Sequence, residues 1–160
     1  MRLVLIALLT IIAGCGGENS PMQKIELKKD TPMDNRATAE AFMQSNAKEE
    51  GVIQTESGLQ YKIIESGEGS TPTMSDTVAA HYAGRLLDGT EFDSSYSRGE
   101  PLTIPVGGVI KGWTEALLMM KEGDKWTLFV PSELGYGERG VGPIPGDSAL
   151  IFDIELIEVK

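Results

Sequence analysis

The chain has 160 residues, with 14 lysines and arginines against 24 aspartates and glutamates, so its formal net charge is −10. This charge excludes the basic surface that a nucleic-acid-binding protein presents to the phosphate backbone. One cysteine and one histidine exclude an internal disulfide framework and a multi-Cys/His zinc site, and we expect neither a metal nor a cofactor. The length predicts one domain with appendages, and the apolar fraction of 41% is sufficient for a core.

The N-terminus has the features of an export signal. Arg2 precedes an apolar run over Leu3–Ile12 that is interrupted only by Thr10. At about 1.5 Å per residue this run spans roughly 15 Å, half of a bilayer core of about 30 Å, so it fits a signal peptide better than a permanent membrane span. Small residues then precede Cys15, the only cysteine of the chain.

This arrangement resembles the processing box of bacterial lipoproteins, in which cleavage precedes a cysteine that becomes lipidated. It predicts a signal peptide over residues 1–14 and a lipid anchor on Cys15; an ordinary secretory signal is the alternative. The resemblance implies attachment to the membrane of a bacterial cell envelope. Gly16, rather than an acidic residue, follows the cysteine, which favours the outer membrane, with the domain facing the periplasm, over the inner membrane.

A tether and a helix are predicted next. Residues 15–35 are polar and lack a sustained apolar period, which predicts a flexible tether from the lipidated cysteine. Between Arg36 and Glu50 apolar residues recur at helical spacing, at Ala39, Phe42, Met43 and Ala47. We expect an amphipathic helix that ends at Glu50, with Gly51 as the residue that stops it, so that residues 36–56 form a helical segment and a linker.

From residue 57 the pattern changes to the period of two that is typical of strands. Strands are predicted at residues 59–64, Val78–Gly84, Leu102–Val106, Lys125–Val130 and Leu150–Val159. In the last of these, Phe152, Ile154 and Leu156 share one face. Asp88-Gly89 between apolar flanks predicts a hairpin.

One helix interrupts the predicted strands. It covers Val109–Lys121 and has Ile110, Trp113, Leu117 and Met120 on one side. Five or six short antiparallel strands around one short helix make an α+β domain over residues 57–160. Gly135–Gly140 matches the spacing GxGxxG, but Pro143 and Pro145 prevent the helix that a dinucleotide site requires, so we expect no nucleotide there.

Several motifs resemble, in the same order, those of the FKBP-type peptidyl-prolyl cis-trans isomerases. They are VAAHYAG at Val78–Gly84, LDGTEFDSS at Leu87–Ser95, VIKGW at Val109–Trp113, LGYG at Leu134–Gly137 and LIFDIEL at Leu150–Leu156. The resemblance implies a curved antiparallel sheet wrapped around one short helix.

The stretch from Phe42 to Tyr61 further resembles the macrophage-infectivity-potentiator branch of bacterial envelope FKBPs. Those relatives carry a longer helical dimerisation region, whereas one helix is predicted before the domain here. The oligomeric state is therefore left open, with a monomer favoured.

The resemblance also implies the site residues. The catalytic group would be Tyr82, Phe92, Asp93, Tyr136 and Phe152, and the substrate-binding group Arg98, Leu102, Val109, Ile110, Trp113 and Ile144. Trp113 would form the pocket floor, the Ile110 N–H and the Tyr136 hydroxyl would donate hydrogen bonds to the peptide, and Asp93 would accept from Tyr82 and pair with Arg98. Leu102 stands where a phenylalanine is common in drug-binding members. Without the resemblance, an ordinary small core would be the better interpretation of the aromatic residues.

The resemblance implies a prolyl isomerase that assists protein folding in the cell envelope. Its partners would be proline-containing polypeptides, and the resemblance adds macrolide inhibitors as ligands. Two alternatives stay open: a lipid-anchored peptide-binding chaperone with little isomerase activity, and a structural adaptor that docks through the helix Arg36–Glu50.

Overall fold

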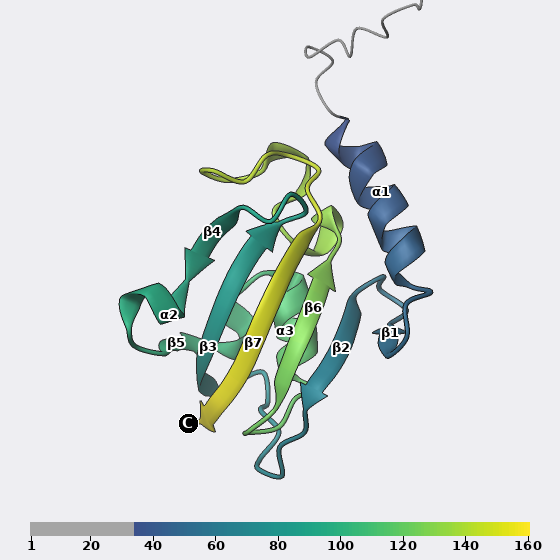
Figure 1. Ribbon diagram of the computed structural model, residues 1–160. Helices are drawn as coiled ribbons and strands as arrows, with labels where there is room; N and C mark the ends of the chain where they lie inside the picture. Colours follow the sequence, from purple (N-terminus) through teal and green to yellow (C-terminus); the bar gives the residue numbers. More distant parts are fainter. Residues whose placement is uncertain (1–33) are drawn as a thin grey trace, which may run out of the picture. The chain divides into compact units, whose positions relative to one another are not determined.

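The computed structural model describes residues 34–160, which form an antiparallel sheet with helices (Figure 1). In chain order the elements are α1 (Asn35–Asn46), β1 (Val52–Gln54), β2 (Gln60–Glu65), β3 (Thr77–Leu86), β4 (Glu91–Ser94), α2 (Ser95–Arg98), β5 (Leu102–Pro105), α3 (Lys111–Leu117), β6 (Lys125–Val130) and β7 (Leu150–Val159), with short 3-10 turns at Val106–Gly108, Ser132–Leu134 and Gly137–Arg139. The predicted signal peptide, the lipidation of Cys15 and residues 15–33 of the tether lie outside the described residues.

The strand order in the sheet is β1-β2-β6-β7-β3-β4, and β5 also pairs with β3. All pairings are antiparallel, and the two longest strands, β3 and β7, lie side by side near the centre. The core between the sheet and α3 contains the fully buried Leu117 and Met120 together with Leu128 and Leu156. The predicted α+β class and the sheet around a short helix are confirmed.

The helix α1 is shorter than predicted. The Asp34 carboxylate begins it by accepting a hydrogen bond from the Ala37 N–H at 3.3 Å, and it ends at Asn46 rather than at Glu50. The Asn46 side chain is buried and donates to Gln60 Oε1 at 2.9 Å, so this tertiary contact fixes the end of the helix. Ala47, predicted on the apolar face, is exposed in the turn that follows.

The stretch predicted as a linker contains β1, which pairs with β2 and extends the sheet to Val52. The helix α2 was not predicted either. The helix α3 covers only Lys111–Leu117 of the predicted Val109–Lys121, because Val109 is extended and Ile110 is the N-cap. None of the helices within residues 34–160 is long and apolar enough to cross a membrane.

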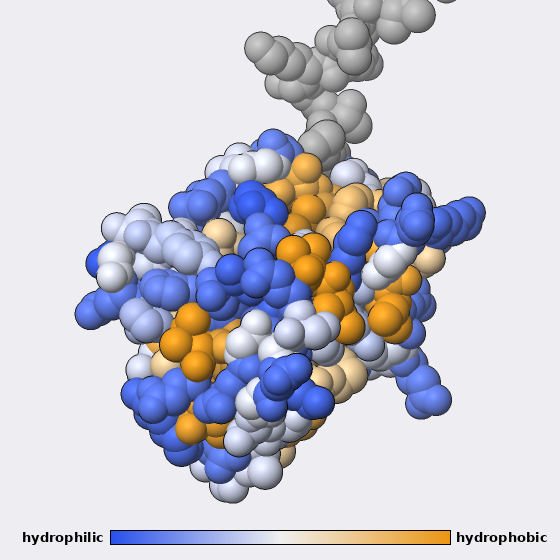
Figure 2. All heavy atoms as spheres, turned by 60° about the horizontal axis from the view of Figure 1, so that its bottom comes forward, coloured by the Kyte–Doolittle hydropathy of each residue, from blue (hydrophilic) through white to orange (hydrophobic). Residues whose placement is uncertain are grey.

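The surface of the described chain is mixed in character. Its exposed large apolar side chains are Ile53, Ile63, Ile64, Met74, Tyr96, Leu118, Met119, Tyr136, Val141 and Ile157. Figure 2 shows that, on the face turned toward the viewer, apolar patches are separated by hydrophilic side chains. A concave pocket lies beside α3.

Candidate functional site

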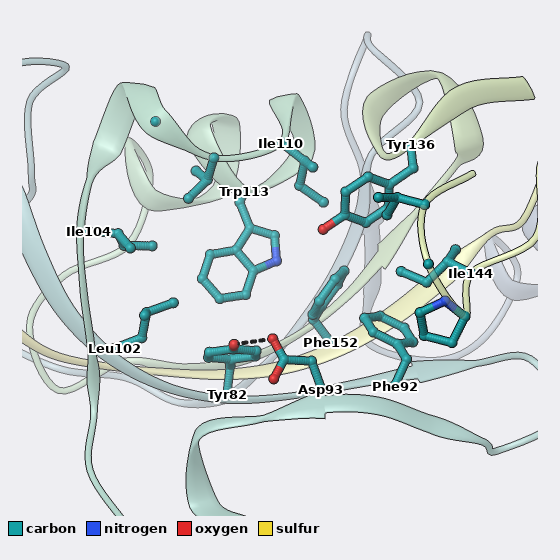
Figure 3. Close-up of a pocket in the computed structure, with 15 residues that line it drawn as sticks. Tyr82, Phe92, Asp93, Leu102, Ile104, Ile110, Trp113, Tyr136, Ile144 and Phe152 are labelled. Carbon is teal, nitrogen blue, oxygen red and sulfur yellow. Dashed lines mark hydrogen bonds between the residues drawn. The ribbon is translucent and has the colours of Figure 1, made fainter. Parts of the chain in front are cut away.

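A cleft of about 630 Å³ opens between the start of α3, the strands β3 to β5 and the loop that precedes β7 (Figure 3). Its lining is predominantly apolar and aromatic, with Asp93 as the only charged residue. The residues that line it are Tyr82, Phe92, Asp93, Leu102, Ile104, Gly108, Val109, Ile110, Trp113, Tyr136, Val141, Gly142, Pro143, Ile144 and Phe152.

Four aromatic rings form a continuous chain of edge-to-face contacts through the cleft. Trp113 meets Tyr82 at a centroid distance of 5.1 Å and Phe152 at 5.3 Å, and Phe152 meets Phe92 at 5.5 Å. The interplanar angles are 84° to 85°, the arrangement that aromatic quadrupoles favour. Each ring holds its neighbour, so the shape of the cleft is set before any ligand enters.

Trp113 is the floor of the cleft and part of the core at the same time. It is 4% exposed, and its first-turn position on α3 points the indole between Tyr82 and Phe152 (Figure 3). The indole Nε1 is buried and has no hydrogen-bond partner among the described residues. The indole is thus held by ring packing and not by a hydrogen bond in this part of the chain.

A polar network forms one edge of the cleft. The Tyr82 hydroxyl donates to Asp93 Oδ2 and accepts from Arg98 Nη2 at 2.8 Å, while Arg98 Nη1 binds Asp93 Oδ1 at 2.5 Å. Burial opposes ionisation of Asp93, but the hydrogen bonds from Tyr82 and Arg98 outweigh it and hold the pKa of the carboxyl below its ordinary value. Burial, followed by the hydrogen bond to Asp93, raises the pKa of Tyr82, so its hydroxyl remains a donor.

The backbone of Tyr82 is held from the other side by α2. Ser95 is fully buried, its Oγ accepts from the Tyr82 N–H at 2.8 Å, and it lies 3.2 Å from the Tyr82 carbonyl oxygen. Ser95 belongs to the motif Leu87–Ser95, but nothing in that motif indicates this role. The hydroxyl supports Tyr82 without lining the cleft.

Two hydrogen-bond donors belong to lining residues on the opposite side of the cleft. The N–H of Ile110, just before α3, makes no hydrogen bond within the described part of the chain. Tyr136 is 38% exposed as a residue, and its hydroxyl points into the cleft (Figure 3). Burial and the charge of Asp93 raise the pKa of Tyr136, so this group also keeps its proton.

Gly84 on β3 lets the aromatic rings come close to the sheet. A Cβ atom at this position would lie 2.7 Å from Phe152 Cε1 and 2.7 Å from Phe92 Cε2, closer than real Cβ contacts. The two rings therefore pack directly on the backbone of a residue that has no side chain.

We expect Gly84→Ala to lower the free energy of unfolding by about 1–3 kcal/mol, because both rings must shift to admit the methyl group. Gly107→Ala is the control, since the nearest atom there is the flexible end of Met74 at 3.3 Å, and its effect is expected within about 0.5 kcal/mol. Urea denaturation measures both variants. Equal stabilities would show that the rings do not depend on Gly84.

All of the predicted catalytic and substrate-binding residues except Arg98 line the cleft. Arg98 is not on the lining but contacts Tyr82 and Asp93 at its edge. The predicted site residues did not include several residues that line the cleft: Ile104, Gly108, Val141, Gly142 and Pro143. Of these, Val141 was noted from the sequence only as a position where some members of the family carry a histidine. Ile104 could have been found, because it lies two residues from Leu102 and shares its strand face. No cluster of possible metal ligands occurs within residues 34–160.

Comparison with protein families gives two matches. Residues 68–157 match the family described as FKBP-type peptidyl-prolyl cis-trans isomerase. Residues 17–63 match the domain amino terminal to FKBP-type peptidyl-prolyl isomerase. Together they cover the cleft and the helix before it.

Known proteins agree with these matches. The 22 kDa FKBP-type peptidyl-prolyl cis-trans isomerase of Escherichia coli is 56% identical over 119 residues, covering 74% of this chain and 58% of that protein. The outer membrane protein MIP of Legionella longbeachae is 50% identical over 128 residues, covering 79% and 55%. A solved peptidyl-prolyl cis-trans isomerase of Pseudomonas syringae superposes with a TM-score of 0.75 at 35% identity, covering 82% of this chain and 98% of that one. The chain spans a little over half the length of the curated relatives it matches.

Proposed function

Because the chain belongs to the FKBP-type peptidyl-prolyl cis-trans isomerases, we propose that it catalyses rotation about X-Pro bonds of extended or unfolded polypeptides and so assists protein folding. The observation that carries this proposal is the cleft itself. It is apolar, preformed by four interlocked rings, and has two free donors and one carboxylate at its edges.

The reaction suits a site that has no nucleophile. Rotation about an X-Pro bond disrupts amide resonance and meets a barrier of about 18–20 kcal/mol, while no covalent bond is made or broken. Catalysis therefore requires only that the twisted amide is bound more tightly than either planar isomer. A gain of about 7 kcal/mol would accelerate the reaction roughly 10⁵-fold.

Each part of the cleft contributes to that difference. The aromatic walls and the Trp113 floor remove water from the proline, which penalises the more dipolar planar amide relative to the twisted one. The Ile110 N–H and the Tyr136 hydroxyl bind carbonyl oxygens of the peptide and fix its orientation. Asp93 orients Tyr82 and places a negative charge at the edge of the cleft. Its role is positional and electrostatic, not that of a base.

An isomerisation assay on a proline-containing peptide, with the chain from residue 16 onward, tests the proposal. We expect acceleration over buffer that saturates with peptide and is inhibited competitively by a macrolide inhibitor of the family. No acceleration in the presence of measurable peptide binding would overturn it and identify a peptide-binding chaperone instead.

The pH dependence of this activity follows from Asp93. Its pKa is lowered from 3.8, so the carboxylate and its ion pair are fully present above that value and are lost as the pH falls through the still lower pKa of the folded state. We expect kcat/KM to be flat from pH 8 down to about pH 5 and to fall only below about pH 4. Circular dichroism at each pH separates this fall from unfolding, and an acid limb near pH 6 in the folded protein would contradict it.

We further propose that residues 1–14 are a signal peptide, that Cys15 carries lipid, and that residues 15–33 tether a monomeric isomerase to the outer membrane, facing the periplasm. The predicted tether reached residue 35, but Asp34 and Asn35 belong to the start of α1. The relative named outer membrane protein MIP supports an envelope location. Cys15→Ser should abolish incorporation of labelled fatty acid and release the protein from membranes. Unchanged labelling and membrane attachment would refute the anchor.

A further inference from the structure

The loop between Gly137 and Asp147 forms one wall of the cleft. The Asp147 N–H donates to the Gly137 carbonyl at 2.9 Å and closes the base of the loop. Val141 and Ile144 exchange two backbone hydrogen bonds, at 3.0 Å and 2.9 Å, and form its tip. The residues of this tip line the cleft, so the position of the tip sets the width of the cleft.

The two arms of the loop pack backbone against backbone. A Cβ atom on Gly140 would lie 2.1 Å from the Ile144 carbonyl oxygen, and one on Gly146 would lie 2.0 Å from the Glu138 carbonyl oxygen. Such contacts leave no room for one arm to slide over the other. A displacement at the base is therefore passed to the tip.

The first turn of α1 binds this base. Arg36 Nη2 lies 2.9 Å from Glu138 Oε1 in the first arm and 2.9 Å from Asp147 Oδ1 in the second. The neighbouring Asn35 Nδ2 donates to the Gly146 carbonyl at 3.1 Å. One guanidinium thus joins two carboxylates that would otherwise repel each other across the loop.

The helix itself is fixed to the sheet and can act as a support. Asn46 at its end donates to the buried Gln60, whose Nε2 donates in turn to the Met43 carbonyl at 2.8 Å. Phe42 meets Phe129 of β6 at a centroid distance of 6.0 Å. Figure 1 shows α1 beside the sheet at the side of β6 and β2.

We propose that Arg36 is a positioning residue for substrate binding: by joining Glu138 to Asp147 it holds the loop 137–147 in the conformation that forms the cleft wall. The inference rests on the proposed isomerase function for its kinetic consequence, whereas the position of the loop does not depend on it. The helix before the domain would then belong to the substrate-binding machinery, although it lines none of the cleft.

Arg36→Ala in the chain from residue 16 onward tests the proposal. We expect KM for a proline-containing peptide to rise about two- to five-fold with kcat unchanged, since the loss concerns exposed ion pairs. Amide hydrogen exchange at Val141 and Ile144, followed by NMR, should become faster. Arg36→Lys keeps the positive charge, so its KM and its exchange rates should lie close to those of the unsubstituted chain.

Arg85→Ala is the matched control, because Arg85 pairs with Asp153 at 2.7 Å on the sheet and neither residue lines the cleft. It should change neither KM nor the two exchange rates. Unchanged KM in Arg36→Ala, or an equal rise in Arg85→Ala, would overturn the proposal. A third outcome separates the two proposals: exchange is faster in Arg36→Ala, but the unsubstituted chain shows no isomerase activity. This result would refute the proposed function, while the claim that Arg36 holds the loop 137–147 in place would stand.

Discussion

Replacing Asp93 by leucine is expected to lower kcat/KM about 10- to 100-fold. The carboxylate is the acceptor that orients the Tyr82 hydroxyl and the only charge on the cleft lining. A hydrogen bond to a charged group contributes about 1.5–3 kcal/mol, which corresponds to this range of rates. Because the Asp93 side chain is 46% exposed, we expect the free energy of unfolding to change by less than about 1 kcal/mol.

Asp153→Leu is a closely matched control for this prediction. Asp153 is 42% exposed, pairs with Arg85 at 2.7 Å and accepts from the Thr127 hydroxyl at 2.8 Å, so it has the same kinds of partner as Asp93. It lies outside the cleft lining. Peptide isomerisation and urea denaturation of both variants separate site from stability. If the two variants lose equal activity, Asp93 has no special role.

The elements that local sequence determines were predicted well. The strands β6 and β7 begin and end at the predicted residues, because alternating apolar residues require one buried face. The hairpin at Asp88-Gly89 also forms. Gly89 adopts a φ of 86° there, which is unfavourable for a residue with a side chain. In both cases the residues that determine the element belong to the element itself or adjoin it.

The elements that distant contacts determine were not predicted. The end of α1 depends on the bond between Asn46 and Gln60, and β1 depends on pairing with β2. The start of α3 moves to Lys111 because the preceding residues are extended along the cleft. A helical period continues through such positions in the sequence, so it cannot locate these boundaries.

The site shows the same division. The ordered motifs located the aromatic rings and Asp93 because each motif is local, and the structure brings these residues together. The support of Tyr82 by Ser95 and the contacts of Arg36 with Glu138 and Asp147 have no local signal. Arg36 is 102 and 111 residues from its two partners, so only the folded chain brings them together.

Trp113→Ala should have the largest effect on stability and activity together. The indole is 4% exposed and contacts both Tyr82 and Phe152, so its removal leaves a cavity in the core and takes away the floor of the cleft. The free energy of unfolding should fall by about 3–5 kcal/mol. In the fraction that remains folded, kcat/KM should fall more than about ten-fold, because Tyr82 and Phe152 lose the indole that packs between them.

Leu117→Ala distinguishes the two roles of Trp113. Leu117 is on the same helix, fully buried in the same core, and absent from the cleft lining. It should cost a comparable 2–5 kcal/mol of stability yet keep kcat/KM within about two-fold at a temperature where circular dichroism shows the variant folded. Trp113→Leu, which keeps an apolar side chain in the core, should regain stability more fully than activity. If Leu117→Ala and Trp113→Ala lose equal activity per folded molecule, the cleft requires only an intact core. The indole would then have no separate role as the floor of the cleft.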